Sequence, residues 1–375
     1  MGSNRPLICL NMIVRDEAAV IERCLASVRP FIDTWVIVDT GSVDDTPARI
    51  QRALAGIAGE LHHRPWKNFG HNRTEALNLA RNRLNRIQQV DDTGGYFLFM
   101  DADETLGTAP DFRFPALTEG AYSLETRFSE LRYDRVNLVS SRLPWRWEGV
   151  LHEYLEAGQT VPQPRLDGLW LEVSTEGARS RDPLKFQKDA AVLEEALRHE
   201  PHNARYVFYL AQSWRDCGQY ALARTQYERR ATMGGWDEEV WYALYQVARL
   251  SELLGDGKEM VVAHYLRAYS NRPTRAEPLV MLARYLRGQN DWNVAYLVAQ
   301  SALPIPISSD RLFVDYPLYA WARHDELALA AFYTGRTDQA ETLWQELLQN
   351  PHLPTEERPR IVQNLGFIPP FRVML

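Results

Sequence analysis

An apolar run that ends in two carboxylates limits the fold of this chain more than any other feature. Residues 96–100 (YFLFM) are typical of a fully buried strand, and Asp101-Ala-Asp103 follows at once. In open α/β sheets, ligands bind in the crevice outside the carboxyl ends of the strands. Two hard oxygen ligands there suit Mg²⁺ or Mn²⁺ with a bound diphosphate. The alternative is that the two aspartates only begin the next helix or turn.

Strands and helices alternate three times before this pair of aspartates. Strand patterns occupy residues 7–14, 34–39 and 60–63, and helical spacing follows each of them. This alternation predicts a parallel sheet with a nucleotide-type site at its edge. Between residues 105 and 172, shorter strand-like segments at 120–128, 132–139, 145–151 and 166–173 predict antiparallel pairing.

Five segments in this half carry a family resemblance. They are residues 10–17 (LNMIVRDE), residues 38–46 (VDTGSVDDT), Trp66 with Phe69, Asn72 and Arg73, residues 100–104 (MDADE), and residues 145–153 (WRWEGVLHE). In this order they resemble the motifs of family 2 glycosyltransferases with a GT-A fold, over roughly residues 7–155. The last segment is similar to the His-Glu motif of a branch whose transferase is followed by tetratricopeptide-like (TPR-like) helices. Bacterial peptide glycosyltransferases of the sublancin S-glycosyltransferase type resemble this branch.

The resemblance implies an α/β domain of the GT-A type (nucleotide-diphospho-sugar transferase, Rossmann-like) at residues 1–180 and an all-α TPR-like domain at residues 181–375. Asp39 would accept a hydrogen bond from the nucleotide base. Asp103 would hold Mn²⁺ or Mg²⁺, Asp101 would bind the ribose, the metal or a metal-bound water, and His152 would complete the metal shell or touch the diphosphate. The other residues expected at the donor are Val14, Arg15, Glu17, Gly41, Asp44, Asn72, Arg73 and Ala102.

Several of these assignments have alternatives. Asp44 could be an ordinary helix-start acid, and Arg73 could be a surface helix residue. Many relatives place Arg before Asn in the third segment, whereas Asn72 precedes Arg73 here, so either side chain could reach the diphosphate. Trp145 and Trp147 could pack in the core or form a platform for a sugar or acceptor ring.

An inverting transfer also needs a base within hydrogen-bond reach of the acceptor's proton. Glu153 and Glu148 are the candidates, and Glu153 is preferred. Glu104 is a third candidate, but its place beside the two aspartates favours a supporting or helix-start role. Residues 127–146 are rich in arginine, which could meet an anionic acceptor or form a salt-bridged, solvated face.

The second half of the chain is predicted to consist of helical hairpins. From Pro183 onward, small and aromatic residues recur at helical spacing, and residues 209–227 have the pattern of a TPR hairpin. Degenerate copies centre on Gly255, Asn290 and Gly335. The aromatic residues Trp236, Trp241, Tyr242 and Tyr245 are expected between helices, and residues 304–310 in a long loop that approaches the catalytic domain or a partner. Stacked repeats could dock an acceptor, mediate homodimerisation, or only support the enzyme.

Composition sets the compartment and the partner class. With 375 residues and 45% hydrophobic content, the chain can bury two domain-sized cores. Its net charge of -7 disfavours nucleic acid as the main partner, and three widely spaced cysteines indicate neither a disulfide framework nor a zinc site. No apolar run approaches the ~20 residues needed to span a bilayer. We therefore expect a cytoplasmic protein without a membrane span.

The resulting hypothesis is a metal-dependent hexosyltransferase that moves a sugar from a nucleotide sugar, expected to be a UDP-sugar, with inversion. The acceptor stays open between a peptide side chain, a glycan, a lipid-linked saccharide, a small molecule and a modified nucleic-acid base. The alternatives are a nucleotide-binding helical-repeat scaffold and a metal-dependent nucleotidyl or phosphoryl transferase. The chain has no Gly-x-x-x-x-Gly-Lys-Ser/Thr loop, which disfavours P-loop chemistry.

Overall fold

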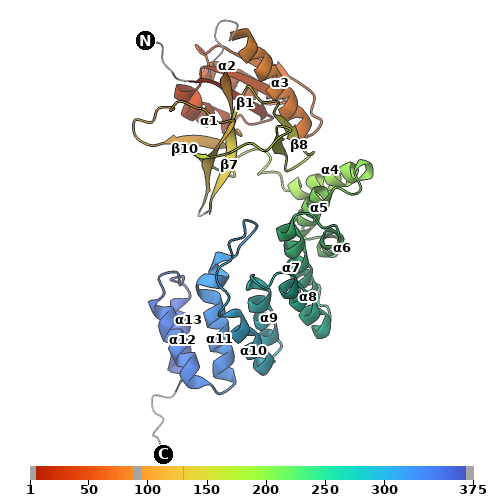
Figure 1. Cartoon of the computed structure of the whole chain (residues 1–375), viewed down its shortest axis with the longest axis vertical. Coiled ribbons are helices and arrows are strands. Elements are labelled where there is room, and N and C mark those ends of the chain that lie inside the picture. Colours follow the sequence, from red (N-terminus) through yellow and green to blue (C-terminus); the bar gives the residue numbers. More distant parts are fainter. Residues whose placement is uncertain (1–5, 88–93, 130, 369–375) are drawn as a thin grey trace, which may run out of the picture. The chain divides into compact units, whose positions relative to one another are not determined.

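The computed structural model describes residues 6–87, 94–129 and 131–368. Contacts divide the chain into two compact units, Met1–Leu193 and Glu194–Leu375, with the division inside helix α4 (Lys185–His199). An α/β unit followed by a helical unit is the predicted fold class, which is confirmed (Figure 1). The boundary expected at residue 180 stays a prediction.

The first half of the α/β sheet is parallel, as the alternation of strands and helices predicts. Its strands are β1 (Leu7–Val14), β2 (Thr34–Asp39), β3 (Gly59–His63) and β4 (Gly95–Phe99), in the order β3-β2-β1-β4. The register places Val14 beside Asp39 and Asn11 beside Phe99. Asp39 and Asp101 therefore lie at the same, carboxyl edge of the sheet.

The sheet continues from β4 with β7 (Leu131–Ser140), β6 (Ala121–Phe128), β10 (Arg165–Val173) and β5 (Glu104–Thr108). Pairing in this half is antiparallel except between β10 and β6. Two short strands, β8 (Arg146–Glu148) and β9 (Tyr154–Glu156), form a separate ribbon. The sequence patterns predict neither β5 nor β9. Because β5 begins at Glu104, the helix-start role considered for this residue is wrong.

Helices cover both faces of the sheet. Ile8, Leu10 and Met12 of β1 share a core with helix α1 (Ile21–Val28) and with Ile50 of helix α2 (Thr46–Ala53). Cys9, on the opposite face of β1, shares a second core with Leu77 of helix α3 (Phe69–Ile87). Side chains of a strand alternate between its faces, so burial on both faces explains why the β1 sequence is continuously apolar. A short 3₁₀ helix, η1 (Arg29–Phe31), follows α1.

The helical unit is built from consecutive hairpins. They are α5 (Ala204–Asp216) with α6 (Tyr220–Ala231), α7 (Asp237–Leu253) with α8 (Lys258–Asn271), α9 (Glu277–Gly288) with α10 (Trp292–Ala302), and α11 (Arg323–Tyr333) with α12 (Thr337–Gln349). Their turns fall at Gly218, Gly255, Asn290 and Gly335, all with left-handed backbone, as the repeat pattern predicts. The π-helix η2 (Leu318–Ala322) precedes α11, and α13 (Arg358–Gly366) follows α12 (Figure 1).

Aromatic residues fill the interior of this unit. Trp241, Tyr242 and Tyr245 are buried, as expected, whereas Trp236 is exposed. The loop between α10 and η2 is tied to its own unit, because Glu238 accepts hydrogen bonds from the backbone N–H of Arg311 (2.9 Å) and Leu312 (2.7 Å). The approach of residues 304–310 to the catalytic domain or a partner stays a prediction. No described helix has the length and apolar character needed to cross a bilayer.

Candidate active site

The start of helix α3 is fastened to the β8–β9 ribbon, and this contact builds the site. The backbone N–H of Gly70 donates to the carbonyl of Gly149 at 3.1 Å, and a Cβ at Gly70 would lie 2.2 Å from that oxygen. One turn later, the Thr74 hydroxyl exchanges hydrogen bonds with the backbone of Trp147 at 2.9 and 3.1 Å. Arg73 is thereby held against the turn that carries Glu153.

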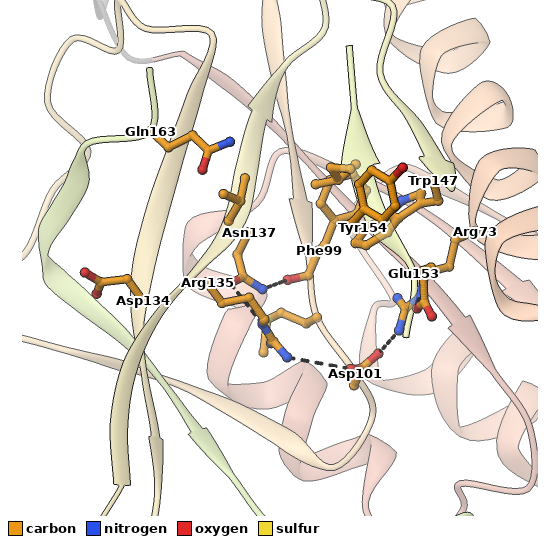
Figure 2. Close-up of a pocket in the computed structure, with 13 residues that line it drawn as sticks. Arg73, Phe99, Asp101, Asp134, Arg135, Asn137, Trp147, Glu153, Tyr154 and Gln163 are labelled. Carbon is orange, nitrogen blue, oxygen red and sulfur yellow. Dashed lines mark hydrogen bonds and ion pairs between the residues drawn. The ribbon is translucent and has the colours of Figure 1, made fainter. Parts of the chain in front are cut away.

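Arg73 joins two of the predicted acidic residues. Its Nε donates to Glu153 Oε1 at 2.6 Å and its Nη2 donates to Asp101 Oδ1 at 2.6 Å (Figure 2). The guanidinium carbon also lies 5.1 Å from the ring centre of Trp147. Burial opposes the charge of Arg73, but its two carboxylate partners raise its pKa further above the ordinary value. Residues 73, 101 and 153 are distant in sequence, and the fold brings them together as one charged cluster.

Asp101 is held from its other side by strand β7. Arg135 Nη1 lies 4.0 Å from Asp101 Oδ2, and its Nη2 donates to the buried Glu104 Oε1 at 2.5 Å. Glu104 Oε2 in turn accepts the backbone N–H of Asp101 at 2.9 Å. Burial raises the pKa of Asp101, but Arg73 and then Arg135 outweigh it and lower the pKa below its ordinary value. Asp101 is therefore an ionised acid clamped between two arginines, with Glu104 supporting it.

A pocket of about 400 Å³ opens beside this cluster. Arg73, Asp101 and Glu153 line one end of it, Arg135 reaches Asp101 from strand β7, and Asp134, Asn137 and Gln163 lie farther from this end (Figure 2). The rest of the lining is mainly aromatic and apolar and includes Phe99, Trp147, Tyr154 and Leu155. Glu153 is 11% exposed and faces this space, whereas Glu148 is 41% exposed, pairs with Arg146 and does not line the pocket.

Asp103 packs against residues 174–181, the segment that follows β10. A Cβ at Gly177 would approach Asp103 Oδ2 to 2.7 Å, so only glycine leaves that carboxylate in its present place. The next backbone N–H, of Ala178, donates to Glu17 Oε2 at 3.1 Å. Burial of the Asp103 carboxylate raises its pKa, and the negative charge of Asp101 raises it further. Burial also raises the pKa of Glu17, to about 7; the Ala178 hydrogen bond opposes this shift, and the charge of Asp103 adds to it.

The chemistry of Asp103 fits a hard cation. No Lys, Arg or His among the described residues forms an ion pair with its carboxylate, and a neighbouring acid makes its charge costly. Mg²⁺ is commonly bound through one or two protein carboxylates together with substrate phosphates. A complete protein cage is not formed: in the described part of the chain, no three His, Cys, Asp or Glu side chains are arranged to hold one ion. His152 is thus not brought to Asp101 and Asp103 as the third ligand that the sequence suggests. It is exposed, in the turn between β8 and β9, outside the pocket lining.

Asp39, at the end of β2, is 3% exposed and organises the loop after it. Its carboxylate accepts the backbone N–H of Gly41 and of Ser42 at 3.3 Å and contacts His63 Nδ1 at 3.2 Å. Asp44 ties the neighbouring loops together, because it accepts hydrogen bonds from the backbone N–H of Ala18 (3.1 Å) and Thr46 (3.0 Å). Because Thr46 is the first residue of α2, the contacts of Asp44 agree with the helix-start alternative.

The other expected donor residues differ in what they can reach. Asn72 of helix α3 is fully buried, and its amide is used by the loop before the helix, accepting from Lys67 N at 2.9 Å and donating to Pro65 O at 3.1 Å. Of the pair that the motif left open, Arg73 is the one that lines the pocket. Val14 and Ala102 are buried and can offer only backbone, while the Arg15 side chain is exposed at the same edge.

Four polar pocket residues escape sequence reasoning: Asp134, Asn137, Tyr154 and Gln163. A signal for Asn137 exists, because it is two residues from Arg135 on one strand and shares its face. Tyr154 begins strand β9, which at three residues is too short to show a period, and Gln163 lies in an irregular segment. Within the arginine-rich region, Arg127 and Arg132 pair with Glu125, and Arg146 pairs with Glu148 and Glu156, whereas Arg135 lines the pocket. Contact of this region with an anionic acceptor stays a prediction.

Comparisons with known proteins agree with this architecture. Residues 9–113 match the model of the family described as glycosyl transferase family 2. A TPR repeat-containing protein of Synechococcus elongatus is 28% identical over 327 residues, which cover 82% of this chain and 69% of that protein.

Solved structures similar to the chain include MamA from Desulfovibrio magneticus (14% identity, 45% of this chain, 85% of that chain, TM-score 0.34). A tetratricopeptide repeat protein from Parabacteroides merdae is also similar (17% identity, 48% of this chain, 68% of that chain, TM-score 0.37). At TM-scores this low, neither likeness adds to the description of the helical unit.

Proposed function

We propose that this chain, which carries a family 2 glycosyltransferase domain at residues 9–113 followed by TPR-like helices, transfers a hexose from a UDP-sugar to an acceptor nucleophile with inversion. One observation carries the proposal: Asp101, Arg73 and Glu153 meet in a pocket at the carboxyl edge of the parallel strands, near Asp103, whose carboxylate forms no ion pair with any residue that the structure describes. This edge is where α/β sheets bind their ligands.

The chain's own groups suit each part of such a transfer. Asp39 accepts hydrogen bonds from the loop after β2 and from His63 where the nucleotide base is expected, and Asp103 would hold Mn²⁺ or Mg²⁺. When bound, the ion supplies positive charge against the leaving diphosphate. Arg73, whose cationic form is stabilised against burial by Asp101 and Glu153, adds a fixed positive charge at the same place.

Glu153 is proposed as the base. The acceptor oxygen or sulfur attacks the anomeric carbon, the bond from that carbon to the diphosphate oxygen breaks, and the acceptor's proton passes to a Glu153 oxygen. The Nε of Arg73 fixes the orientation of that carboxylate through Oε1, which leaves Oε2 for the proton. Attack from the side opposite the leaving group gives inversion.

Calorimetric titration with UDP-, GDP- and dTDP-sugars, first with Mn²⁺ and then with chelator, tests the proposal. We expect binding of one UDP-sugar that is lost with chelator, and slow hydrolysis of that donor without acceptor. Asp103→Ala should abolish the metal dependence without unfolding the protein, because a partly exposed polar residue that precedes β5 contributes little to the core. Nucleotide binding without release of sugar would instead favour the scaffold or the phosphoryl-transfer alternative.

Cytoplasmic location and a homodimer formed through the repeats stay predictions.

A further inference from the structure

The β8–β9 ribbon, which carries Glu153 in its turn, is separate from the eight-stranded sheet and rests on helix α3. Each of its strands has three residues, and an isolated two-stranded ribbon is only marginally stable in water. Trp145, just before β8, is 3% exposed and belongs to the core beside α3, whereas Trp147 is partly exposed and lines the pocket. The position of Glu153 therefore depends on how the ribbon is fixed to α3.

Three donors on one face of α3 meet three alternate carbonyl groups of residues 145–149. The pairs are the Gly70 N–H with Gly149, the Thr74 hydroxyl with Trp147 and Arg81 Nη2 with Trp145, each at 3.1 Å. Four residues of a helix rise about 6 Å and two residues of a strand span about 6.6 Å, so the two elements stay aligned while they run in opposite directions. The helix thereby fixes the register of the strand that lies along it.

Thr74 is the side chain that binds both backbone groups of one strand residue. Its hydroxyl donates to the Trp147 carbonyl and accepts from the Trp147 N–H at 2.9 Å. Gly70 contributes only backbone, and an arginine side chain such as Arg81 is long and has no acceptor. Thr74 does not line the pocket, although its neighbour Arg73 does. Its contacts are therefore with the ribbon and not with the space that a ligand would fill.

A shift of the ribbon along α3 would separate Glu153 from Arg73. The two side chains are joined by a hydrogen bond of 2.6 Å, and Arg73 is next to Thr74 in the helix. Moving the strand by two residues would displace Glu153 by about 6.6 Å, beyond the reach of this bond. A misplacement of only about 1 Å at a reacting group can cost roughly 100-fold in rate.

We propose that Thr74 is the positioning residue of the base: through the backbone of Trp147 it holds the ribbon in the register that keeps Glu153 against Arg73. The inference rests on the proposed transfer, in which Glu153 takes the proton of the acceptor. Since Thr74 touches the ribbon and not the donor, its loss should lower kcat and leave donor affinity unchanged.

Hydrolysis of a UDP-sugar, with water as the acceptor, measures this effect. The water oxygen bonds to the anomeric carbon, the bond from that carbon to the diphosphate oxygen breaks, and a water proton passes to Glu153, which gives free sugar and UDP. The probes are UDP-glucose, UDP-galactose and UDP-N-acetylglucosamine with Mn²⁺. We expect Thr74→Val to lower kcat by about 10- to 100-fold, with the calorimetric donor affinity within about twofold of the parent. Thr74→Ser keeps the hydroxyl and should recover kcat to within about threefold of the parent.

The matched control is Thr34→Val. Thr34 is 1% exposed at the amino end of β2, and its hydroxyl donates to the Ala58 carbonyl at 2.7 Å and accepts from Arg83 Nε. Valine at this position also removes two hydrogen bonds, but at the edge of the sheet opposite to the site. Thr34→Val should lower the midpoint of urea unfolding, as Thr74→Val does, and leave kcat unchanged.

A double-mutant cycle separates positioning of the base from general support of the fold. In a Glu153→Gln background, measured with enzyme in excess over donor, Thr74→Val should cause no further loss, because the residue that it positions has already lost its function. Hydrogen exchange of residues 145–153, followed by mass spectrometry without substrate, should be faster in Thr74→Val and parent-like in Thr74→Ser and Thr34→Val.

Five results would overturn the inference while leaving the proposed function intact. They are a parent-like kcat in Thr74→Val, a fall in its donor affinity as large as the fall in kcat, no recovery in Thr74→Ser, an equal loss in the Glu153→Gln background, and unchanged hydrogen exchange of residues 145–153. Failure of the proposed function looks different, because the parent would then neither bind nor hydrolyse any nucleotide sugar, whatever the hydrogen exchange of the variants.

Discussion

The positions of Arg73 and Glu153 depend on contacts that only the folded chain makes. The two side chains are 12% and 11% exposed and 2.6 Å apart, and both face the pocket. Glu148 belongs to the same segment of sequence but points into a surface ion pair with Arg146. Chemically the two glutamates are identical, so only their surroundings distinguish a base from a solvated surface residue.

Glu153→Gln should therefore reduce transfer by about 10²- to 10⁴-fold with donor affinity almost unchanged, since the amide keeps the shape but cannot accept the proton. Initial rates with a saturating donor, together with calorimetry of donor binding, measure the two effects. Glu148→Gln is the matched control and should keep nearly full activity. Equal losses in both variants, or a loss in Glu148→Gln alone, would refute the assignment of the base.

Gly177 provides a second test at the residue scale. In Gly177→Ala the new Cβ meets the end of the Asp103 side chain, which can swing away at a small cost to stability. We expect metal-dependent donor binding to weaken by about 1 kcal/mol, roughly fivefold, because the carboxylate leaves its place. Isothermal titration with and without Mn²⁺ measures this. Gly288→Ala, where nothing lies within 4 Å of the added Cβ, is the control. An unchanged donor affinity in Gly177→Ala would show that Asp103 does not act through this position.

At the scale of elements, the strands and helices were predictable where one local pattern dominated. β1, β2 and β4 are continuous apolar runs, and the hairpin turns at Gly218, Gly255 and Gly335 carry the residue that left-handed backbone favours. β5 (ETLGT) was not predictable because it has a single large apolar residue and no apolar run, and β9 because three residues are too few to show a period. Hydrogen bonds from Arg272 and Arg275 to Asp310 hold the loop of residues 304–310 to its own unit, and its expected approach to another domain or a partner stays a prediction.

Asp310 is the anchor of that loop and gives it a pH dependence. Its carboxylate accepts from Arg272 Nε at 2.6 Å and from Arg275 Nη1 at 3.1 Å. The Arg272 hydrogen bond, aided by Arg275 and opposed by burial, lowers the pKa of Asp310 below its ordinary value of 3.8. The ionised carboxylate thus stabilises the folded unit above pH 3.8, and this contribution fades as the pH falls through the lower, folded-state pKa.

Asp310→Asn should lower the free energy of unfolding at pH 7 by roughly 1–3 kcal/mol, because two arginines lose a charged acceptor. The difference from the parent should shrink as the pH is lowered below 3.8. Urea unfolding at pH 7 and at about pH 3 measures both. A constant difference between parent and variant across this range would contradict the role of ionisation.

At the scale of the whole molecule, the two units have separate hydrophobic cores. One cluster holds Phe208, Trp241, Trp344 and their neighbours, and the two clusters around the sheet include no residue of the helical unit. Damage to one core should therefore leave the ligand site of the other unit intact.

Trp344→Ala tests that independence. Trp344 is 1% exposed, so its truncation should destabilise the helical unit by about 3–5 kcal/mol. Calorimetry should then show one transition at lower temperature, while nucleotide-sugar binding at a temperature below both transitions is unchanged. Trp236→Ala, at an exposed tryptophan of the same unit, is the control and should change neither the transition temperature nor the binding of the nucleotide sugar. Loss of donor binding in Trp344→Ala alone would show that the units are energetically coupled.

The sequence by itself determined the class of fold, the carboxyl-edge position of Asp39, Asp101 and Asp103, and the hairpins of the second half. Each of these depends on neighbours a few residues apart, through side-chain periodicity and turn conformation. Only the tertiary structure decided that Arg73 rather than Asn72 meets Asp101, that Glu153 rather than Glu148 faces the pocket, and that Tyr154 and Gln163 line it. Those contacts join segments far apart in the chain, and no local pattern encodes which of two similar side chains the packing will turn inward.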